Sequence, residues 1–347
     1  MTAKSTQKSG RRNDTNPVPA VSAVLTGGAL IEMICDPERR QTAFAVWWDG
    51  AWQRMEGIED DAGRLLEPHA FDNDFVRNKV VLFAAKPVEY GSQEKLIEDI
   101  RSFIHRYVEL DSEFERFASY YVLFTWLHDA FNEVPYLRVR GDYGTGKTRF
   151  LQTVGSISYR PMFASGASTI SPVFHMLDRF GGTLVIDEAD FRFSDEKAEM
   201  VKILNNGIIH GMPVLRANMN RQREFEPRAF QVFGPKIVAT RGDYDDKGLD
   251  SRFITAEMRC RKVRADIPLN LPNEHEAEAR ELRDKLLMYR FRNRGRCRLN
   301  SGLVDRNIEP RLNQMLVPLL SVVESAQALD ALREVAQRHH ESRKASA

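Results

Sequence analysis

The chain has 347 residues, in which 50 lysines and arginines almost balance 49 aspartates and glutamates. Its length suits one large α/β domain with smaller parts, and its balanced charge gives no overall preference for nucleic acid. Three widely spaced cysteines, eight histidines without metal-ligand spacing and no long apolar run argue against a disulfide framework, a zinc site and a membrane span, so we expect a cytoplasmic protein.

The first ninety residues predict a leader followed by a small module. Residues 1–19 are rich in Ser, Thr, Lys, Arg and Pro without the apolar core of a signal peptide, and we expect them to be disordered. Within residues 20–90, the apolar runs 43–48 and 80–83 predict strands, and the Asp-Gly pair at 49–50 predicts a hairpin turn. This part of the chain is expected to form a small α+β N-terminal module.

Residues 91–133 predict a helical connector. Apolar residues recur at helical spacing over residues 92–109, which indicates an amphipathic helix. A second helix is expected over residues 112–131, with Ser112 and Glu115 forming a capping box at its start. Both helices are expected to pack against the domain that follows.

The segment that follows has the complete pattern of a phosphate-binding loop, G-x-x-x-x-G-K-[ST]. Apolar residues 136–139 before it predict a buried strand, and residues 149–154 after it predict the start of a helix. These flanks favour a real loop over a glycine-rich turn without a ligand. The loop residues expected to bind ATP are Gly141, Asp142, Tyr143, Gly144, Thr145, Gly146, Lys147 and Thr148.

The side chains of this loop have distinct expected roles. The glycines allow backbone N–H groups to converge on phosphate oxygens at the start of a helix. Lys147 is expected to reach the β- and γ-phosphates, and the hydroxyl of Thr148 is expected to bind Mg²⁺. The sequence therefore predicts a site for ATP together with Mg²⁺.

The strand predicted over residues 183–186 ends in two carboxylates, Asp187 and Glu188. Such a strand end lies at the sheet edge where ligands bind. We expect Asp187 to hold Mg²⁺ and Glu188 to orient and deprotonate the attacking water. An Asp-Glu pair after an apolar run is common in proteins. Because this pair follows the phosphate loop with Lys147, we expect the two motifs to form one ATP site. The glutamate favours hydrolysis over transfer to a substrate hydroxyl.

Two further strands carry polar residues at their ends. Thr240 ends a buried strand and is our candidate for contact with the γ-phosphate or the water, with Arg241 as its rival. Arg252 lies just before the next strand, which is predicted over residues 254–258, and this place suits an arginine finger reaching the phosphate of a neighbouring subunit. The alternative is a local salt bridge between Arg252 and Asp250.

Alternating strands and helices predict a mostly parallel sheet with helices on both faces. We assign residues 134–265 to this ATPase core. Helical spacing over residues 274–290, 311–323 and 326–339 predicts a helical lid within residues 266–347.

The segments GDYGTGKT, TLVIDEAD, FGPKIVAT and GLDSRF resemble the AAA+ superfamily of P-loop ATPases. They look most like the helicase modules of primase-helicases from phages, plasmids and integrative elements, which are related to minichromosome-maintenance and superfamily 3 helicases. The resemblance covers residues 134–337. It implies ATP bound between subunits of a homo-oligomeric ring, Arg252 acting in trans, and a lid arginine at Arg311. The family often has Asn where this chain has Thr240.

The resemblance also gives a role to a predicted hairpin. Residues 211–225 contain two extended arms around an Asn-Met-Asn bend. In the resembled helicases, a hairpin at this point grips one DNA strand in the ring pore. The residues expected to bind its phosphates are Arg216, Arg221 and Arg223. The alternative is a solvated loop whose charge is neutralised by nearby glutamates.

These observations predict an ATP-hydrolysing motor that unwinds or translocates on DNA, with single-stranded DNA as its partner, in replication of a mobile genetic element. Two alternatives stay open. One is a protein-remodelling or loader AAA+ ATPase that does not act on nucleic acid directly, and the other is a nucleotide-binding scaffold with little turnover.

Overall fold

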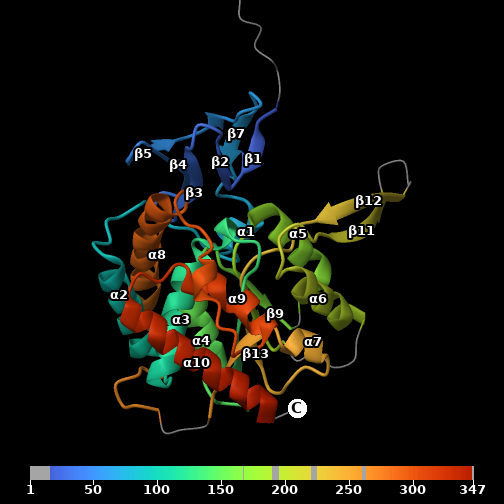
Figure 1. Cartoon of the computed structure of the whole chain (residues 1–347). Helices are drawn as coiled ribbons and strands as arrows, with labels where there is room; N and C mark the ends of the chain where they lie inside the picture. Colours follow the sequence, from blue (N-terminus) through green and yellow to red (C-terminus); the bar gives the residue numbers. More distant parts are fainter. Residues whose placement is uncertain (1–15, 167, 190–194, 220–224, 260–262, 346–347) are drawn as a thin grey trace, which may run out of the picture.

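A five-stranded parallel sheet lies at the centre of the molecule (Figure 1). The structure, a computed structural model, describes residues 16–345 except 167, 190–194, 220–224 and 260–262. The strands of this sheet are β8 (Tyr136–Arg140), β9 (Met162–Ser165), β10 (Leu184–Asp187), β13 (Lys236–Thr240) and β14 (Phe253–Glu257). Their order across the sheet is β14-β8-β13-β10-β9.

This order brings the sequence motifs together. All neighbouring strands pair in parallel, so their carboxyl ends meet at one edge of the sheet. Strand β13 lies between β8, which precedes the loop, and β10, which precedes the two carboxylates. The central strands are buried along almost their whole length, as expected for a parallel sheet covered by helices. The predicted α/β class is confirmed.

Helices flank the central sheet (Figure 1). They are α2 (Gln93–Tyr107), α3 (Ser112–Thr125), α4 (Lys147–Ser156), α5 (Ile170–Phe180), α6 (Asp195–Asn206), α7 (Lys247–Asp250), α8 (Glu274–Asn293), α9 (Pro310–Leu320) and α10 (Ala326–Ala345), with 3₁₀ turns η1 (His128–Ala130) and η2 (Ser301–Leu303). Helix α4 packs against β8, β10 and β13, and α8 packs against both α2 and α4. None of the helices in the described residues has the length and apolar character needed to cross a membrane.

The predicted start of α3 at Ser112 is confirmed, whereas its predicted capping box and its predicted end are wrong. The cap is Asp111, whose side chain accepts a hydrogen bond from the backbone N–H of Phe114 at 2.8 Å. Glu115 makes no capping box, because its buried carboxylate contacts His105 at 2.7 Å and Arg101 at 3.3 Å. The helix ends at Thr125, where the threonine hydroxyl bonds back to a carbonyl of the last turn and a 3₁₀ turn follows.

The N-terminal part is built mostly of strands. They are β1 (Val18–Ala20), β2 (Ser22–Val24), β3 (Leu30–Asp36), β4 (Gln41–Trp48), β5 (Ala51–Met55), β6 (Ile58–Glu59) and β7 (Leu65–Pro68), followed by the short helix α1 (Asp74–Arg77). They form the sheets β1-β7-β6 and β2-β3-β4-β5. The hairpin turn at Asp49 and Gly50 is confirmed, and both residues have the positive φ that a tight turn between β4 and β5 requires. Strand β1 begins inside the predicted leader, of which residues 1–15 lie outside the described part.

Residues 80–83 do not form the predicted strand. Val81 makes a single antiparallel bridge to Met162. The carbonyl of Val80 accepts from the N–H of Phe163 at 3.0 Å, and the N–H of Leu82 donates to Pro161 at 3.1 Å. This apolar segment therefore covers the open edge of β9 with a few main-chain bonds, which its composition alone does not distinguish from a full strand.

The predicted hairpin is present, but its arms are shifted along the chain: Asn218 and Met219, expected at the bend, are paired within the first arm. Strands β11 (Val214–Met219) and β12 (Phe225–Phe230) pair antiparallel and project from the body of the molecule (Figure 1). The side chains of Val214 and Phe230 at its base are buried, and Phe230 packs against Phe174 of α5.

Candidate active site

The loop between β8 and α4 has a backbone that only glycine supports at three positions. Gly144 and Gly146 have φ values of 72° and 89°, in the left-handed region. A Cβ atom on Gly141 would lie 2.3 Å from the carbonyl oxygen of Met258. The hydroxyl of Thr145 donates to the Asp142 carbonyl at 2.8 Å, which fixes the curl of the loop. The N–H groups at the start of α4 are thereby free to bind an anion.

The loop and the carboxylate strand meet directly. The hydroxyl of Thr148 donates to a carboxylate oxygen of Asp187 at 2.6 Å. Hydroxyl and carboxylate oxygens are hard ligands of the kind that Mg²⁺ prefers, so these two residues fit a shared magnesium ion. The ammonium of Lys147 donates to the carbonyls of Gly141 and Asp142 at 2.6 and 2.7 Å. Lys147 therefore lies within the curl of the loop, where a phosphate would replace these carbonyls.

Glu188 is held in an unusual backbone conformation. Its φ is 53°, a region that costs a non-glycine residue on the order of 1 kcal/mol or more. Its backbone N–H donates to the carboxylate of Asp187 at 2.9 Å, and a Cβ atom on Gly166 would lie 2.6 Å from its carbonyl oxygen. The side chain is 69% exposed and lines the cavity beside the loop.

A cavity of about 360 Å³ brings three separate segments together. Its lining comes from Tyr143 to Arg149 of the loop and α4, from Asp187 and Glu188, and from Arg241. The predicted loop lysine, loop threonine and both carboxylates thus share one open site. This arrangement can hold a triphosphate, a hard cation and a water close to a carboxylate base.

Thr240 and Arg241 lie differently from our first expectation. Thr240 is 1% exposed, and its hydroxyl has no hydrogen-bond partner within the described part of the chain. Its carbonyl accepts from the N–H of Gly141 at 3.1 Å, so it supports the loop from below. The cavity is lined by Arg241 instead. The geometry therefore favours Arg241 over Thr240 as the residue that contacts the γ-phosphate or the water.

A second cavity of about 180 Å³ lies along the other side of the loop. It shares Gly144, Thr145, Gly146 and Arg149 with the first, and most of its remaining lining is apolar. Arg149 donates to the carbonyls of Pro268 and Leu269 at 2.9 and 2.6 Å, which ties the start of α4 to the segment before α8. An apolar slot that continues a phosphate loop suits a nucleobase. Sequence patterns missed this wall, because residues 107–111 and 263–269 carry no motif.

Arg252 and Arg311 lie together, away from this site. Arg252 precedes β14, whose five residues at roughly 3.3 Å each separate it by about 16 Å from the loop edge of the sheet. Arg311 donates to the hydroxyl of Ser251 at 2.7 Å. Partial burial lowers the pKa of Arg252, and the charge of Arg311 lowers it further. The Nε of Arg252 is buried and has no hydrogen-bond partner among the described residues.

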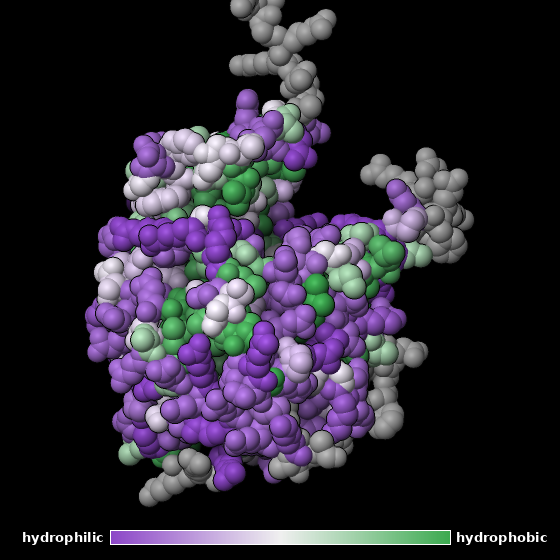
Figure 2. Space-filling model, viewed as in Figure 1, coloured by the Kyte–Doolittle hydropathy of each residue, from purple (hydrophilic) through white to green (hydrophobic). Residues whose placement is uncertain are grey.

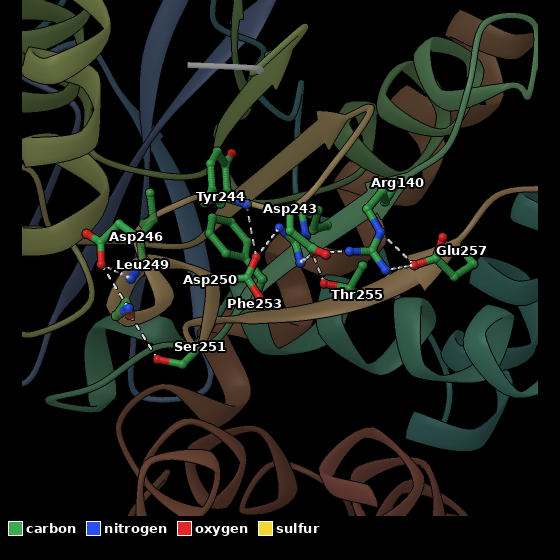
Figure 3. A network of polar contacts seen from close by, with 12 residues as sticks. Arg140, Asp243, Tyr244, Asp246, Leu249, Asp250, Ser251, Phe253, Thr255 and Glu257 are labelled. Carbon is green, nitrogen blue, oxygen red and sulfur yellow. Dashed lines mark hydrogen bonds and ion pairs between the residues drawn. The ribbon is translucent and has the colours of Figure 1, made fainter. Parts of the chain in front are cut away.

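A network of charged side chains anchors the segment that carries Arg252 (Figure 3). Arg138 of β8 is 2% exposed and donates to Asp250 at 2.6 Å and to Thr255 at 2.9 Å. Arg140 lies between Asp243 and Glu257 and pairs with both (Figure 3). Asp250, the partner of Arg252 in the alternative interpretation, is thus bound by Arg138. Strand β8 thus leads into the phosphate loop at its carboxyl end, and its Arg138 side chain binds Asp250 of α7.

The hairpin residues are only partly described. Arg216 lies over the ring of Phe174, 4.6 Å from its centroid, with Glu199 3.9 Å away. Its guanidinium therefore contacts α5 and α6. Arg221 and Arg223 lie outside the described residues. The outward face of the arms is apolar: Leu215 is 71% exposed, and hydrophobic surface is visible on the hairpin where it leaves the body (Figure 2).

The loop, the paired carboxylates and the strand between them define an α/β fold with a phosphate-binding loop at the carboxyl edge of its parallel sheet. No family model matches the chain, and no curated protein matches it. Its fold is similar to solved helicase structures. A full-length MCM homologue from Methanopyrus kandleri aligns at 11% identity over 87% of this chain and 69% of that one, with a TM-score of 0.44.

Two other solved structures are similar over most of the chain. The SCCmec type IV Cch helicase aligns at 11% identity over 93% of this chain and 76% of that one, with a TM-score of 0.35. The NrS-1 C-terminal region aligns at 12% identity over 88% and 72%, with a TM-score of 0.33. Because these scores are low, the class assignment rests on the strand order and site residues of this chain.

Proposed function

We propose that this chain is an ATP-hydrolysing AAA+ motor that works as a homo-oligomeric ring on DNA. The observation that carries the proposal is the convergence of Lys147, Thr148, Asp187 and Glu188 in one cavity. A role in replication of a mobile genetic element follows only from the resemblance of its motifs. Direct evidence would come from ATP hydrolysis by the purified protein and its response to DNA.

In this proposal four residues of the cavity carry the chemistry. Lys147 exchanges the loop carbonyls for the β- and γ-phosphates, and Thr148 and Asp187 hold Mg²⁺, which neutralises phosphate charge when bound. Glu188 accepts a proton from water as the water oxygen bonds to the γ-phosphorus and the bond to the ADP oxygen breaks. The apolar slot along the loop receives the adenine base of the nucleotide.

The pair Arg252 and Arg311 supports a shared site. Two guanidinium groups close together repel each other, and their placement becomes favourable when an anion neutralises them. They lie too far from the loop of their own chain to provide this charge there. We assign both to the phosphates of a neighbouring subunit, with Arg252 as the finger and Arg311 beside it.

Mixing two inactive variants tests this assignment. Lys147→Ala protein lacks a competent nucleotide site, and Arg252→Ala protein lacks the finger. A mixed ring contains sites with an intact loop next to an intact finger, so we expect partial recovery of ATP turnover. Turnover equal to wild type in Arg252→Ala alone would show that this residue is no finger.

DNA is the proposed track, and the hairpin is its proposed contact. Arg216 braces the hairpin against α5 and α6, while Arg221 and Arg223 remain the proposed phosphate contacts. ATP turnover measured with and without single-stranded DNA should rise with DNA in the wild type. The rise should be lost in the Arg221→Ala/Arg223→Ala double variant. No stimulation in either protein would contradict a DNA motor.

One observation favours the second candidate, a protein-remodelling or loader ATPase. Leu215, Ala217 and Ala229 form an exposed apolar face on the hairpin arms, which suits contact with protein. If this candidate is correct, Leu215→Glu should abolish remodelling of the partner protein. DNA should leave ATP turnover unchanged.

A further inference from the structure

A small cavity lies between helices α2, α3 and α10. Helix α3 packs against both of the other two, and the cavity between them measures about 190 Å³. Its polar lining comes from Arg101 of α2, from Arg116 and Tyr120 of α3, and from Ser325 and Gln327 at the start of α10. It shares none of its described lining residues with the ATP cavity, and α2 and α3 lie on the opposite side of the molecule from the β11–β12 hairpin (Figure 1). The cavity is therefore separate from the proposed contacts with ATP and with DNA.

Two arginines bring positive charge to this cavity. Arg116 is half-buried and has no ion-pair or hydrogen-bond partner within the described part of the chain. Arg101 donates to the carboxylate of Glu115 at 3.3 Å, and its buried Nε has no hydrogen-bond partner among the described residues. The described lining of the cavity contains no carboxylate. Its walls therefore carry positive charge, of which Glu115 balances only a part.

The hydroxyl of Tyr120 adds a hydrogen-bond donor. Tyr120 lies four residues after Arg116, so both side chains project from the same face of α3. The residue lines the cavity and is 4% exposed, and no hydrogen-bond partner of its hydroxyl lies among the described residues. Burial raises the pKa of Tyr120, and the charges of Arg116 and Arg101 oppose this shift only in part. The hydroxyl therefore keeps its proton at neutral pH and can donate to a ligand oxygen.

The start of α10 supplies backbone donors. The Ser325 hydroxyl accepts from the N–H of Ala328 at 3.3 Å, and the Ser325 carbonyl accepts from the N–H of Leu329 at 3.0 Å. The N–H groups of Ala326 and Gln327 have no acceptor among the described residues, as is usual in the first turn of a helix. Helix α10 is 20 residues long, and the positive end of its dipole favours an anion at this turn.

We propose that this cavity is a second phosphate site, distinct from the ATP site, which binds inorganic phosphate or the phosphate group of a small monoester. Guanidinium groups and helix starts are donors that recur around phosphate oxygens in proteins, and here two guanidinium groups, a phenol and free N–H groups meet. The cavity of about 190 Å³ is smaller than pockets for drug-sized ligands, which begin at about 300 Å³. It therefore suits a phosphate group with its waters and not a whole nucleotide. This inference does not depend on the proposed function.

Two carboxylates near the Tyr120 hydroxyl oppose anion binding. In addition to burial, the charges of Glu94 and Glu324 raise the pKa of Tyr120. Both glutamates are exposed, so water and salt screen their repulsion of a phosphate. Glu94 lines the larger hollow next to the cavity. The second phosphate site should therefore be weak, and removal of the Glu94 charge should strengthen it.

Phosphate binding by the Lys147→Ala protein tests this site, because the variant lacks the lysine that would hold phosphate at the ATP loop. A phosphorus NMR titration with inorganic phosphate should give a Kd on the order of 1 mM. With Lys147→Ala as the parent, Arg116→Met should weaken binding about tenfold, Tyr120→Phe should weaken it about threefold, and Glu94→Gln should strengthen it about twofold. The same titration with glycerol 3-phosphate distinguishes the two sources of phosphate. Tighter binding of the ester assigns the site to small monoesters, and tighter binding of inorganic phosphate assigns it to the free ion.

Arg306→Met is the matched control. Arg306 is exposed and, like Arg116, has no partner among the described residues, but it lies in the segment before α9. Its substitution in the same parent should leave phosphate affinity unchanged, and thermal unfolding checks that each variant is folded. No phosphate binding by the parent, or an affinity unchanged by Arg116→Met or by Tyr120→Phe, would overturn the second phosphate site. The proposed ATPase is tested separately through ATP binding by the wild type, so either proposal can fail alone.

Discussion

At the scale of single residues, Glu188 is assigned to the hydrolysis step and Lys147 to nucleotide binding. Glu188 lies at the edge of the cavity and Lys147 lies inside the loop. Glu188→Gln should therefore bind ATP but lose about 10²- to 10⁴-fold in kcat, the usual contribution of a general base. Single-turnover hydrolysis with radiolabelled ATP measures this loss. Near-normal turnover in Glu188→Gln would exclude Glu188 as the base. Little turnover in the wild type itself would favour the scaffold hypothesis.

Buried histidines make stability depend on pH. Burial, reinforced by nearby arginine charges, lowers the pKa of His128 from its ordinary value of 6.5 to about 4. Burial likewise lowers the pKa of His275 to about 4. Between pH 6.5 and 4 the unfolded chain takes up these protons and the folded chain does not. The free energy of unfolding should thus fall as pH decreases, by up to about 1.4 kcal/mol per pH unit for each histidine.

Denaturant unfolding at pH 7, 6 and 5 measures this slope. The variant His128→Asn, which keeps a donor for the carbonyl of Thr125, should show a smaller decrease than wild type. Equal slopes in the two proteins would mean that His128 is protonated in the folded state.

At the scale of elements, strand β8 does two jobs. It ends in the phosphate loop, and its buried Arg138 holds Asp250 beside the finger. Arg138→Met leaves that carboxylate without its cation and should cost about 3 kcal/mol of unfolding free energy or more. It should also lower ATP turnover while nucleotide affinity is retained, because the finger loses its support.

Arg140→Met is the matched control for stability. Arg140 lies two residues along the same strand and also pairs with two carboxylates, but its side chain is 26% exposed against 3% for Arg138. Its loss should cost no more than about 1 kcal/mol. Equal destabilisation by the two substitutions, measured by thermal and denaturant unfolding, would show that burial does not decide the strength of these pairs.

The elements near the site were predictable because their signals are local. A buried strand, a glycine loop and a helix start lie consecutively in the sequence, and the strands ending at Asp187 and Thr240 are short apolar runs. The cap of α3 was not predictable with certainty, since Asp111 and Ser112 are both good capping residues. The segment at residues 80–83 was mistaken for a strand because its apolar composition is that of a strand. How many main-chain bonds it makes to β9 depends on the tertiary structure.

The parts of the site that the sequence did not reveal depend on distant contacts. Thr240 and Arg241 are adjacent, and only the sheet decides which side chain faces the cavity. The proximity of Arg311 to Ser251 joins the lid to α7 across sixty residues, and no pattern encodes it. The slot wall at residues 263–269 depends on how the chain returns from β14 to the lid.

At the scale of the whole molecule, a buried ionic cluster joins the N-terminal strands to the loop domain. Glu32 of β3 is 2% exposed and accepts hydrogen bonds from Arg290 of α8 at 2.7 Å and from Tyr159 at 2.9 Å. Arg290 also pairs with Asp129 at 2.7 Å, and Trp47 of β4 stacks on Phe291. We infer that the N-terminal part and the ATPase core unfold together.

Glu32→Gln tests this coupling. The substitution leaves Arg290 with one carboxylate where it had two, and should cost about 3 kcal/mol of unfolding free energy. Scanning calorimetry should show one transition in wild type and a lower Tm in the variant, with Glu38→Gln, an exposed neighbour on the same part of the chain, unchanged. Two separate transitions in wild type would contradict the coupling.

The most decisive measurement is the affinity of the purified protein for magnesium-loaded ATP, compared between wild type and Lys147→Ala. The lysine is held in the curl of the loop and the Thr148–Asp187 pair lies beside it. We expect saturable binding by wild type and a loss of about 100-fold or more in the variant, the scale of one or two charge-assisted hydrogen bonds. No binding by wild type, or equal binding by both proteins, would contradict the assignment of this cavity as an ATP site.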